Sequence, residues 1–196
     1  MAPPPALPLI LASGSPRRRE LLVRAGVRFE ARAADVDERP RAGESAEALV
    51  ERLARAKALA VARRVGPDPP RRVLGADTVV VLGDEVLGKP RDADHALALL
   101  RRLCGRSHRV LTGVALVESD TLAARGRVVE SRVHMRPSPE RALRAYVAGG
   151  EPLDKAGAYA AQGEGRRLIE RIEGSETNVI GLPLDETLAL LGEIGA

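Results

Sequence analysis

The chain has 196 residues, a net charge of +4 from 31 basic and 27 acidic side chains, and only three aromatic residues. This length suits one domain with a sizeable core, and the sequence contains no apolar run long enough to span a membrane. The mixed charges and scarce aromatic side chains disfavour a nucleic-acid-binding surface. The single cysteine, Cys104, excludes an internal disulfide, so we expect a cytoplasmic protein.

The chain begins with a segment, residues 1–7, that lacks the features of a signal peptide and that we expect to be a disordered tail. An apolar strand at 7–12 precedes a Gly/Ser turn, and Ser15 followed by Pro16 predicts the start of a helix that runs to Ala25. The first helical turn carries Arg17, Arg18 and Arg19, although the positive end of a helix favours anions. The pattern indicates a phosphate site, with a solvated surface turn as the alternative.

A strand at 27–33 is followed by an acidic loop that contains Asp35, Asp37 and Glu38. Three clustered carboxylates could hold a divalent metal, because hard cations prefer oxygen ligands; the alternative is a solvated turn. Ser45 predicts the N-cap of a helix that ends near Arg64. Lys57 lies beside the apolar stripe of this helix, so we expect it at the rim between core and solvent.

Residues 73–82 are strand-like and apolar on both sides of Asp77. An ionised aspartate in such a run is costly unless it is paired or binds a metal, and the alternative is a strand edge or bulge. A turn and a short returning strand, 86–87, lead to Lys89 between Gly88 and Pro90. Lys89 therefore lies on a constrained turn, which suits a positioned cation.

A helix is expected at 92–104, followed by an antiparallel pair of strands, 108–117 and 128–135, joined around Gly126. A second helix at 138–148, a strand at 168–172 and a last helix at 183–191 complete the predicted elements. Cys104 occupies a buried position of its helix, and we expect His108 and His134 to have structural roles because their spacing does not suit a metal. The segment 151–165 combines small residues with Lys155 and Gln162, which permits close approach of the backbone to a ligand.

Three segments together resemble the Maf family of nucleoside triphosphate pyrophosphatases: Ser13-Gly14-Ser15-Pro16-Arg17-Arg18, then Gly75-Ala76-Asp77-Thr78 with Gly88-Lys89-Pro90, and Asp154-Lys155-Ala156-Gly157-Ala158-Tyr159 ending in Val179-Ile180-Gly181-Leu182-Pro183. The resemblance runs from about Leu9 to Leu191. It implies a two-lobed α/β fold, with a long mixed β-sheet flanked by helices, related to the inosine triphosphate pyrophosphatase architecture. Residues 8–196 would then form a single domain with the active-site cleft between the lobes, and a homodimer is expected.

The resemblance also implies the chemistry. A nucleoside triphosphate would be hydrolysed to the monophosphate and pyrophosphate with Mg²⁺ or Mn²⁺. Asp77 matches the family's proton acceptor and Glu38 the carboxylate that assists with metal or water, so both are expected metal ligands. The residues expected around the phosphates are Ser13, Arg17, Arg18, Lys57 and Lys89.

Three positions resemble the family branch that acts on dTTP and UTP: Arg17, Thr78 and Gln162. The sequence departs from that branch at Ala160-Ala161 and at Glu176, which leaves the phosphate set unchanged. Two other classes of function compete with the enzyme. The chain could be a nucleotide-binding regulator of septum formation with little turnover, or an arginine-rich protein that binds nucleic acid, which the separated basic segments disfavour.

Overall fold

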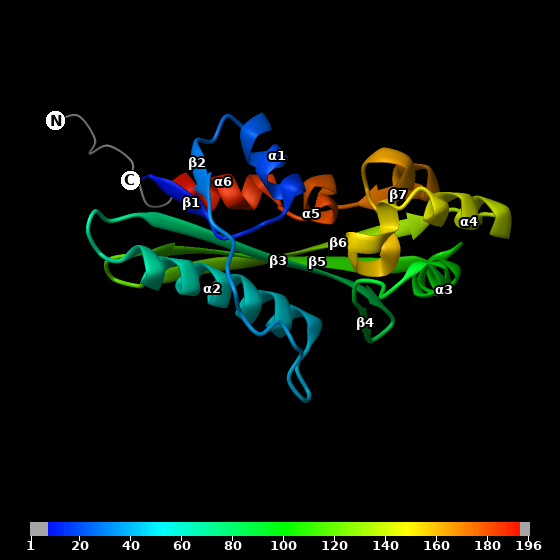
Figure 1. Cartoon of the computed structure of the whole chain (residues 1–196), viewed down its shortest axis with the longest axis horizontal. Coiled ribbons are helices and arrows are strands. Elements are labelled where there is room, and N and C mark those ends of the chain that lie inside the picture. The colour runs from blue at the N-terminus through cyan, green and yellow to red at the C-terminus, as the bar shows by residue number, and fades with distance from the viewer. Residues whose placement is uncertain (1–7, 193–196) are drawn as a thin grey trace. The chain divides into compact units, whose positions relative to one another are not determined.

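The computed structural model describes residues 8–192, so the expected tail at 1–7 lies outside the described residues (Figure 1). The strands are β1 Leu9–Leu11, β2 Phe29–Ala31, β3 Arg72–Leu82, β4 Glu85–Leu87, β5 Ser107–Glu118, β6 Ala124–Met135 and β7 Ile169–Glu173. The α-helices are α1 Pro16–Arg24, α2 Ala46–Val65, α3 Ala93–Leu103, α4 Glu140–Ala148, α5 Glu176–Ile180 and α6 Leu184–Gly192. Short 3₁₀ helices lie at η1 Glu151–Asp154, η2 Ala156–Ala158 and η3 Gly163–Leu168.

The strands form a seven-stranded sheet in the order β2-β1-β3-β5-β6-β7, with β4 paired to β3. Strand β1 pairs in parallel with β2 and β3, whereas β4 is antiparallel to β3 and β7 to β6. The predicted mixed sheet with helices is therefore confirmed. Strand β1 pairs with residues 72–74 of β3 and β4 pairs with residues 80–82, so Asp77 lies between these two paired stretches.

The chain divides into two compact units, and the boundaries fall within β3, β5 and β6. The described part of the first unit comprises residues 8–77, 112–129 and 181–192, and the second comprises residues 78–111 and 130–180. Each unit has its own apolar cluster, which is why each is described separately.

In the first unit, α2 runs along one face of the strands, where its backbone approaches them closely (Figure 1). A Cβ atom at Gly75 would lie 2.1 Å from the Ala54 carbonyl oxygen, and one at Gly113 would lie 2.3 Å from that of Val50. Only glycine fits at such distances. The helix begins at Ser45, whose side chain accepts a hydrogen bond from the Ala48 N–H as an N-cap. Cap and glycines together fix where α2 lies on the strands.

In the second unit, the apolar residues of α3 and α4 pack with those of β5, β6 and β7. Helix α3 begins at Asp92, whose carboxylate accepts a hydrogen bond from the His95 N–H, as its position before the apolar run predicts. Cys104 caps the end of α3 and is half-buried, so its expected burial is only partial.

The predicted junction between the two long strands is wrong. The turn lies at 119–123, and Gly126 lies inside β6. A Cβ atom there would be 2.9 Å from the Val114 carbonyl oxygen, so this glycine permits a close strand contact rather than a turn. Helix α5 was not predicted either, because its five residues are too few to show a helical period.

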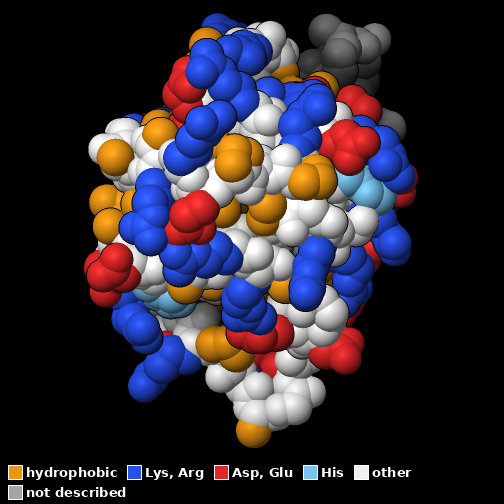
Figure 2. Space-filling model, turned by 90° about the vertical axis from the view of Figure 1, so that its right-hand side faces the viewer, with side chains coloured by type: hydrophobic (Ala, Val, Ile, Leu, Met, Phe, Trp, Pro, Cys, Tyr) orange, Lys and Arg blue, Asp and Glu red, His pale blue; other side chains and the backbone are white. Residues whose placement is uncertain are grey.

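Within residues 8–192, no helix combines the length and apolar character that a bilayer crossing requires. Figure 2 shows one face of the molecule, on which Lys and Arg side chains are interspersed with acidic and hydrophobic ones. Positive charge on that face is therefore not separated from negative charge.

Candidate active site

A buried lysine joins two carboxylates in the first unit. The Lys57 Nζ atom lies 2.7 Å from Asp77 Oδ1 and 2.7 Å from Glu38 Oε1. Lys57 is 8% exposed and Asp77 7%, whereas the Glu38 side chain is 57% exposed. Lys57 was expected at the rim of the core, but it is buried because it pairs with Asp77. The cost of an ionised aspartate inside a strand is thus offset by a direct ion pair.

The close approach of α2 to β3 makes this ion pair possible. Asp77 lies two residues after Gly75, and residues two apart along a strand point to the same face. Gly75 contacts the backbone at Ala54 and Ala58, the latter next to Lys57. The missing side chain at Gly75 therefore brings the helix near enough for Lys57 to reach Asp77.

The burial of these groups shifts their protonation. Burial raises the pKa of Asp77 above that of an exposed aspartate, against the opposing effect of the Lys57 and Arg18 cations. Burial also lowers the pKa of Arg18, opposed by the Asp77 carboxylate. Asp77 consequently binds a proton more readily than an exposed aspartate would, a property that suits a proton acceptor.

Arg18 ties three parts of the first unit together. Its Nε donates to the Gly181 carbonyl oxygen at 2.8 Å, and its Nη1 donates to the Ala76 carbonyl oxygen at 2.9 Å. Nη1 also donates to the Ser13 hydroxyl at 3.2 Å, and that hydroxyl accepts from the Ser15 N–H at 3.2 Å. The guanidinium therefore links the start of α1 to the residue that precedes Asp77.

The three arginines at the start of α1 have different environments. Arg18 is engaged as described, Arg17 is half-buried, and Arg19 is exposed. The positive charge of Arg17 contributes to the lowered pKa of Arg18. Ser15 occupies the N-cap position and Pro16 the first turn, as predicted, although the Ser15 side chain makes no capping hydrogen bond.

Asp77 and Glu38 are the carboxylates with which this site could hold a metal. Both are hard oxygen donors, and Mg²⁺ is commonly held by one or two carboxylates together with water and substrate phosphates. The donor set therefore fits Mg²⁺ or Mn²⁺. Among residues 8–192, no three or more His, Cys, Asp or Glu side chains lie together as metal ligands, so the three carboxylates of the acidic loop do not converge. Asp37 instead binds Arg39, which lowers the Asp37 pKa to about 2.

The other predicted site residues belong to the second unit. Thr78 is half-buried in β3, Lys89 is exposed after β4, and Gln162 is half-buried before η3. Lys155 donates to the Glu151 carbonyl oxygen at 2.6 Å and to Asp154 Oδ1 at 2.5 Å, so it stabilises the chain locally. Their contribution to a common site with the first unit stays a prediction from the family resemblance.

Sequence reasoning missed two features of the site. The Gly181 carbonyl oxygen accepts from Arg18, and Arg52 donates to Glu44 and to the carbonyl oxygen of Arg39, the residue after Glu38. A backbone acceptor leaves no trace in a sequence, and Arg52 is one arginine among many. Arg52 and Lys57 both lie on α2 but are five residues apart, so helical spacing does not link them.

Comparison with known proteins places these residues in a family. The sequence model described as Maf-like protein matches residues 8–194. The dTTP/UTP pyrophosphatase of Myxococcus xanthus is 56% identical over 189 residues, which cover 95% of this chain and 92% of that protein. The dTTP/UTP pyrophosphatases of Hahella chejuensis and Aromatoleum aromaticum are 49% and 50% identical, with 95% of this chain covered and 92% and 95% of theirs.

A solved structure of a nucleoside-triphosphatase / dITP/XTP pyrophosphatase from Mycobacterium abscessus covers 96% of both chains. Its TM-score of 0.44 and sequence identity of 14% are too low to support an argument about this site. The family model, by contrast, matches residues 8–194, and the relatives at 56% and 49% identity cover 95% of the chain. The chain therefore belongs to the Maf family.

Proposed function

We propose that this protein hydrolyses dTTP and UTP to the nucleoside monophosphate and pyrophosphate. The observation that carries the proposal is the Lys57 ammonium between the carboxylates of Asp77 and Glu38. Relatives at 49–56% identity are named dTTP/UTP pyrophosphatases, which supports the same reaction and bases for this chain. Arg17, Thr78 and Gln162 are the residues that we propose select the base.

The reaction requires water to attack a phosphorus atom while negative charge spreads over phosphate oxygens, so positioning and electrostatics dominate catalysis. Asp77 accepts the proton of the attacking water, a role that its raised pKa favours. Lys57 holds the Asp77 carboxylate in place through its 2.7 Å contact. The phosphates are bound by Ser13, Arg17, Arg18 and Lys57, and by Lys89 of the second unit.

We propose that Asp77 and Glu38 hold a Mg²⁺ or Mn²⁺ ion. When bound, the ion supplies positive charge that neutralises phosphate oxygens and polarises water. Glu38 suits this role because its side chain is the more exposed of the two carboxylates and lies on a loop. We further propose a cytoplasmic location, in keeping with the lone Cys104, and a homodimer that binds no nucleic acid.

Pyrophosphate release from a nucleotide panel tests the proposal. With Mg²⁺ or Mn²⁺ present, we expect turnover of dTTP and UTP to exceed that of dATP, dGTP and dCTP, and a chelator to stop it. Detectable nucleotide binding without turnover would instead support the alternative of a regulator of septum formation. Binding of DNA that weakens steeply with salt, without nucleotide turnover, would support the nucleic-acid alternative.

A further inference from the structure

We infer that Arg52 is a positioning residue that holds Glu38 against Lys57. The inference rests on the proposed function for its kinetic consequence, because Glu38 is there a ligand of the metal. The structural part, that Arg52 fixes the loop that carries Glu38, stands on contacts within the first unit. This loop, residues 32–45, connects β2 to α2 and is called the Glu38 loop below.

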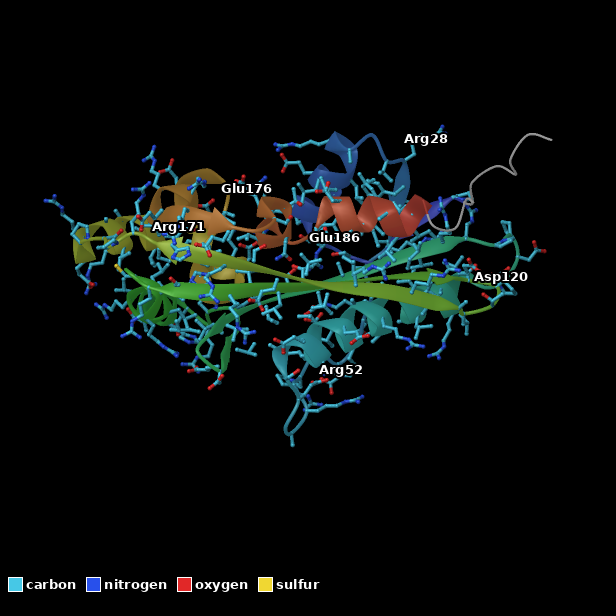
Figure 3. The ribbon with its side chains drawn as sticks, turned by 180° about the vertical axis from the view of Figure 1, so that it is seen from behind. Arg28, Arg52, Asp120, Arg171, Glu176 and Glu186 are labelled. Carbon is cyan, nitrogen blue, oxygen red and sulfur yellow. The ribbon has the colours of Figure 1, made fainter. Side chains whose placement is uncertain are left out.

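The guanidinium of Arg52 holds the Glu38 loop at two points. Its Nε and Nη2 donate to the two carboxylate oxygens of Glu44 at 2.5 and 2.8 Å, and Nη2 also donates to the Arg39 carbonyl oxygen at 3.2 Å. Figure 3 shows Arg52 on α2, next to the loop that precedes the helix. One of the two attachment points is therefore the residue directly after Glu38.

The loop is also held by the ion pair of Glu38 with Lys57 and by hydrogen bonds of its backbone at Arg32 and Ala33, near its start. It contains no strand or helix, and the Glu38 side chain is 57% exposed, so apolar packing does not fix that residue. Within the loop, Glu44 Oε2 accepts from the Arg41 N–H at 3.0 Å, and the Glu44 N–H donates to the Arg41 carbonyl oxygen at 3.1 Å. Arg52 joins this local turn to α2, the helix that also carries Lys57.

The pair is more buried than comparable surface pairs, which argues that it orders the loop. The Arg52 and Glu44 side chains are 20% and 9% exposed, against 42% and 60% for the bidentate pair of Arg102 and Glu85. Bidentate arginine–carboxylate pairs fix geometry as well as charge. The pKa of Arg52 is raised chiefly by its hydrogen bonds to Glu44, with a smaller contribution from the Asp77 carboxylate. Arg52 thus lies within the electrostatic reach of the site.

Loss of Arg52 should therefore act through Glu38. Without the guanidinium, the loop loses its attachment at Arg39 and Glu44, and Glu38 is no longer held near Lys57. Substitutions of residues that orient metal ligands reduce metal affinity or activity about 10–100-fold. We expect R52M to lower kcat/KM about ten-fold and to raise the Mg²⁺ concentration needed for half-maximal activity.

A double-mutant cycle separates positioning from a direct role. R52M, E38Q and the double variant R52M/E38Q are compared with R102M, which removes a bidentate Arg–Glu pair in the second unit. We expect R52M to have no further effect in the E38Q background, and R102M to match the wild type. The conservative R52K should recover part of the activity, because lysine retains the charge but not the bidentate geometry. Equal losses from R52M in both backgrounds would overturn the inference.

Hydrogen exchange provides a readout that does not depend on turnover. We expect the amide of Arg41 and those around it to exchange faster in R52M and not in R102M, because Glu44 then no longer fixes the turn. Unchanged exchange in R52M would also overturn the inference. A wild-type protein that releases no pyrophosphate would sink the proposed function instead, and the exchange result would still decide whether Arg52 holds the loop.

Discussion

Both units bury uncharged polar side chains, but they differ in whether they bury charged ones. Within residues 8–192, the buried charged residues are Lys57 and Asp77, and both belong to the first unit. In the second unit the buried polar side chains are the uncharged Ser131 and Asn178 and a histidine, His108, whose pKa is lowered by burial. His108 Nε2 lies 2.7 Å from the Tyr159 hydroxyl, and Asn178 donates to the Val110 carbonyl oxygen and to Ser131 Oγ. Burial lowers the pKa of His108 to about 4, so its ring is neutral at pH 7.

The difference shows what each arrangement achieves. A neutral hydrogen-bonded pair, such as His108 Nε2 with the Tyr159 hydroxyl, fixes packing without burying a charge. A buried ion pair carries a desolvation penalty that well-packed apolar residues would avoid. The first unit accepts that penalty at Lys57 and Asp77, the residues that we propose perform the chemistry. The second unit buries polar groups in a form that serves structure.

The largest effect on activity is expected from loss of the Asp77 carboxylate. D77N keeps the size of the side chain and an oxygen that can accept from Lys57, but it removes the proton acceptor. We expect pyrophosphate release from dTTP to fall about a thousand-fold. Circular dichroism and melting temperature should stay close to the wild type, because Lys57 keeps its ion pair with Glu38. Turnover near that of the wild type would refute the role of Asp77.

The contribution of the ion pair to stability should also become measurable when its cation, Lys57, is removed. K57M leaves the Asp77 carboxylate buried without its partner, and one-sided loss of a buried pair typically destabilises a protein by about 3–5 kcal/mol. Urea unfolding at pH 7 measures this loss, and we expect part of it to be recovered as the pH is lowered, because burial raises the pKa of Asp77 and a protonated Asp77 no longer buries an unpaired charge. K57M/D77N is the control, because the unpaired charge is then absent. A K57M protein as stable as the wild type would contradict the claim that the first unit depends on a buried ion pair.

The neutral histidine of the second unit predicts a different pH response. In the unfolded chain His108 takes up a proton near pH 6.5, whereas in the folded protein it does so only near pH 4. Protons therefore favour the unfolded state in this window, and stability should fall by about 3 kcal/mol as the pH drops through it. H108Q, which does not titrate, should lack this component of the decline. Equal pH dependence in both proteins would contradict the assignment.

The smallest effect is expected at a glycine of the second unit. Gly163 has φ +64°, and a Cβ atom there would lie 2.3 Å from Glu151 Oε1. The same carboxylate accepts from the Gly165 N–H at 3.0 Å through Oε2. G163A should cost about 1–3 kcal/mol of stability from backbone strain and the displaced carboxylate, and should raise KM for dTTP if the neighbouring Gln162 contacts the base. Gly150, at φ +77° with nothing within 4 Å, offers the control G150A, which has strain without collision.

Much of this fold follows from local sequence signals. The N-caps at Ser45 and Asp92 give the starts of α2 and α3, because each side chain bonds an N–H three residues further on. Asp77 and Lys57 each stood out as a charged residue next to apolar ones. Their pairing depends on how α2 lies on β3, and no spacing along the chain encodes that.

Other parts of the site could not be predicted from the residues. Arg18 was interpreted as a phosphate ligand, yet it also donates to carbonyl oxygens 58 and 163 residues away. Every residue has a carbonyl group, so only the folded chain selects which ones accept. In the sequence, Arg52 is indistinguishable from the other arginines, and only its contacts with the Glu38 loop identify it. Local patterns thus identify elements, whereas the partners of long side chains come from tertiary structure.

The reach of Lys57 is set by a residue without a side chain. Gly75 lets the α2 backbone rest directly on β3, where a Cβ atom would collide with the Ala54 carbonyl oxygen and with the backbone nitrogen of Ala58. A single added methyl group would lift the helix, and with it the ammonium that binds Asp77. The ion pair of Lys57 and Asp77 therefore depends on an uncharged backbone contact between α2 and β3. Substitution of Gly75 would therefore disrupt the ion pair even though every charged residue of the sequence is retained.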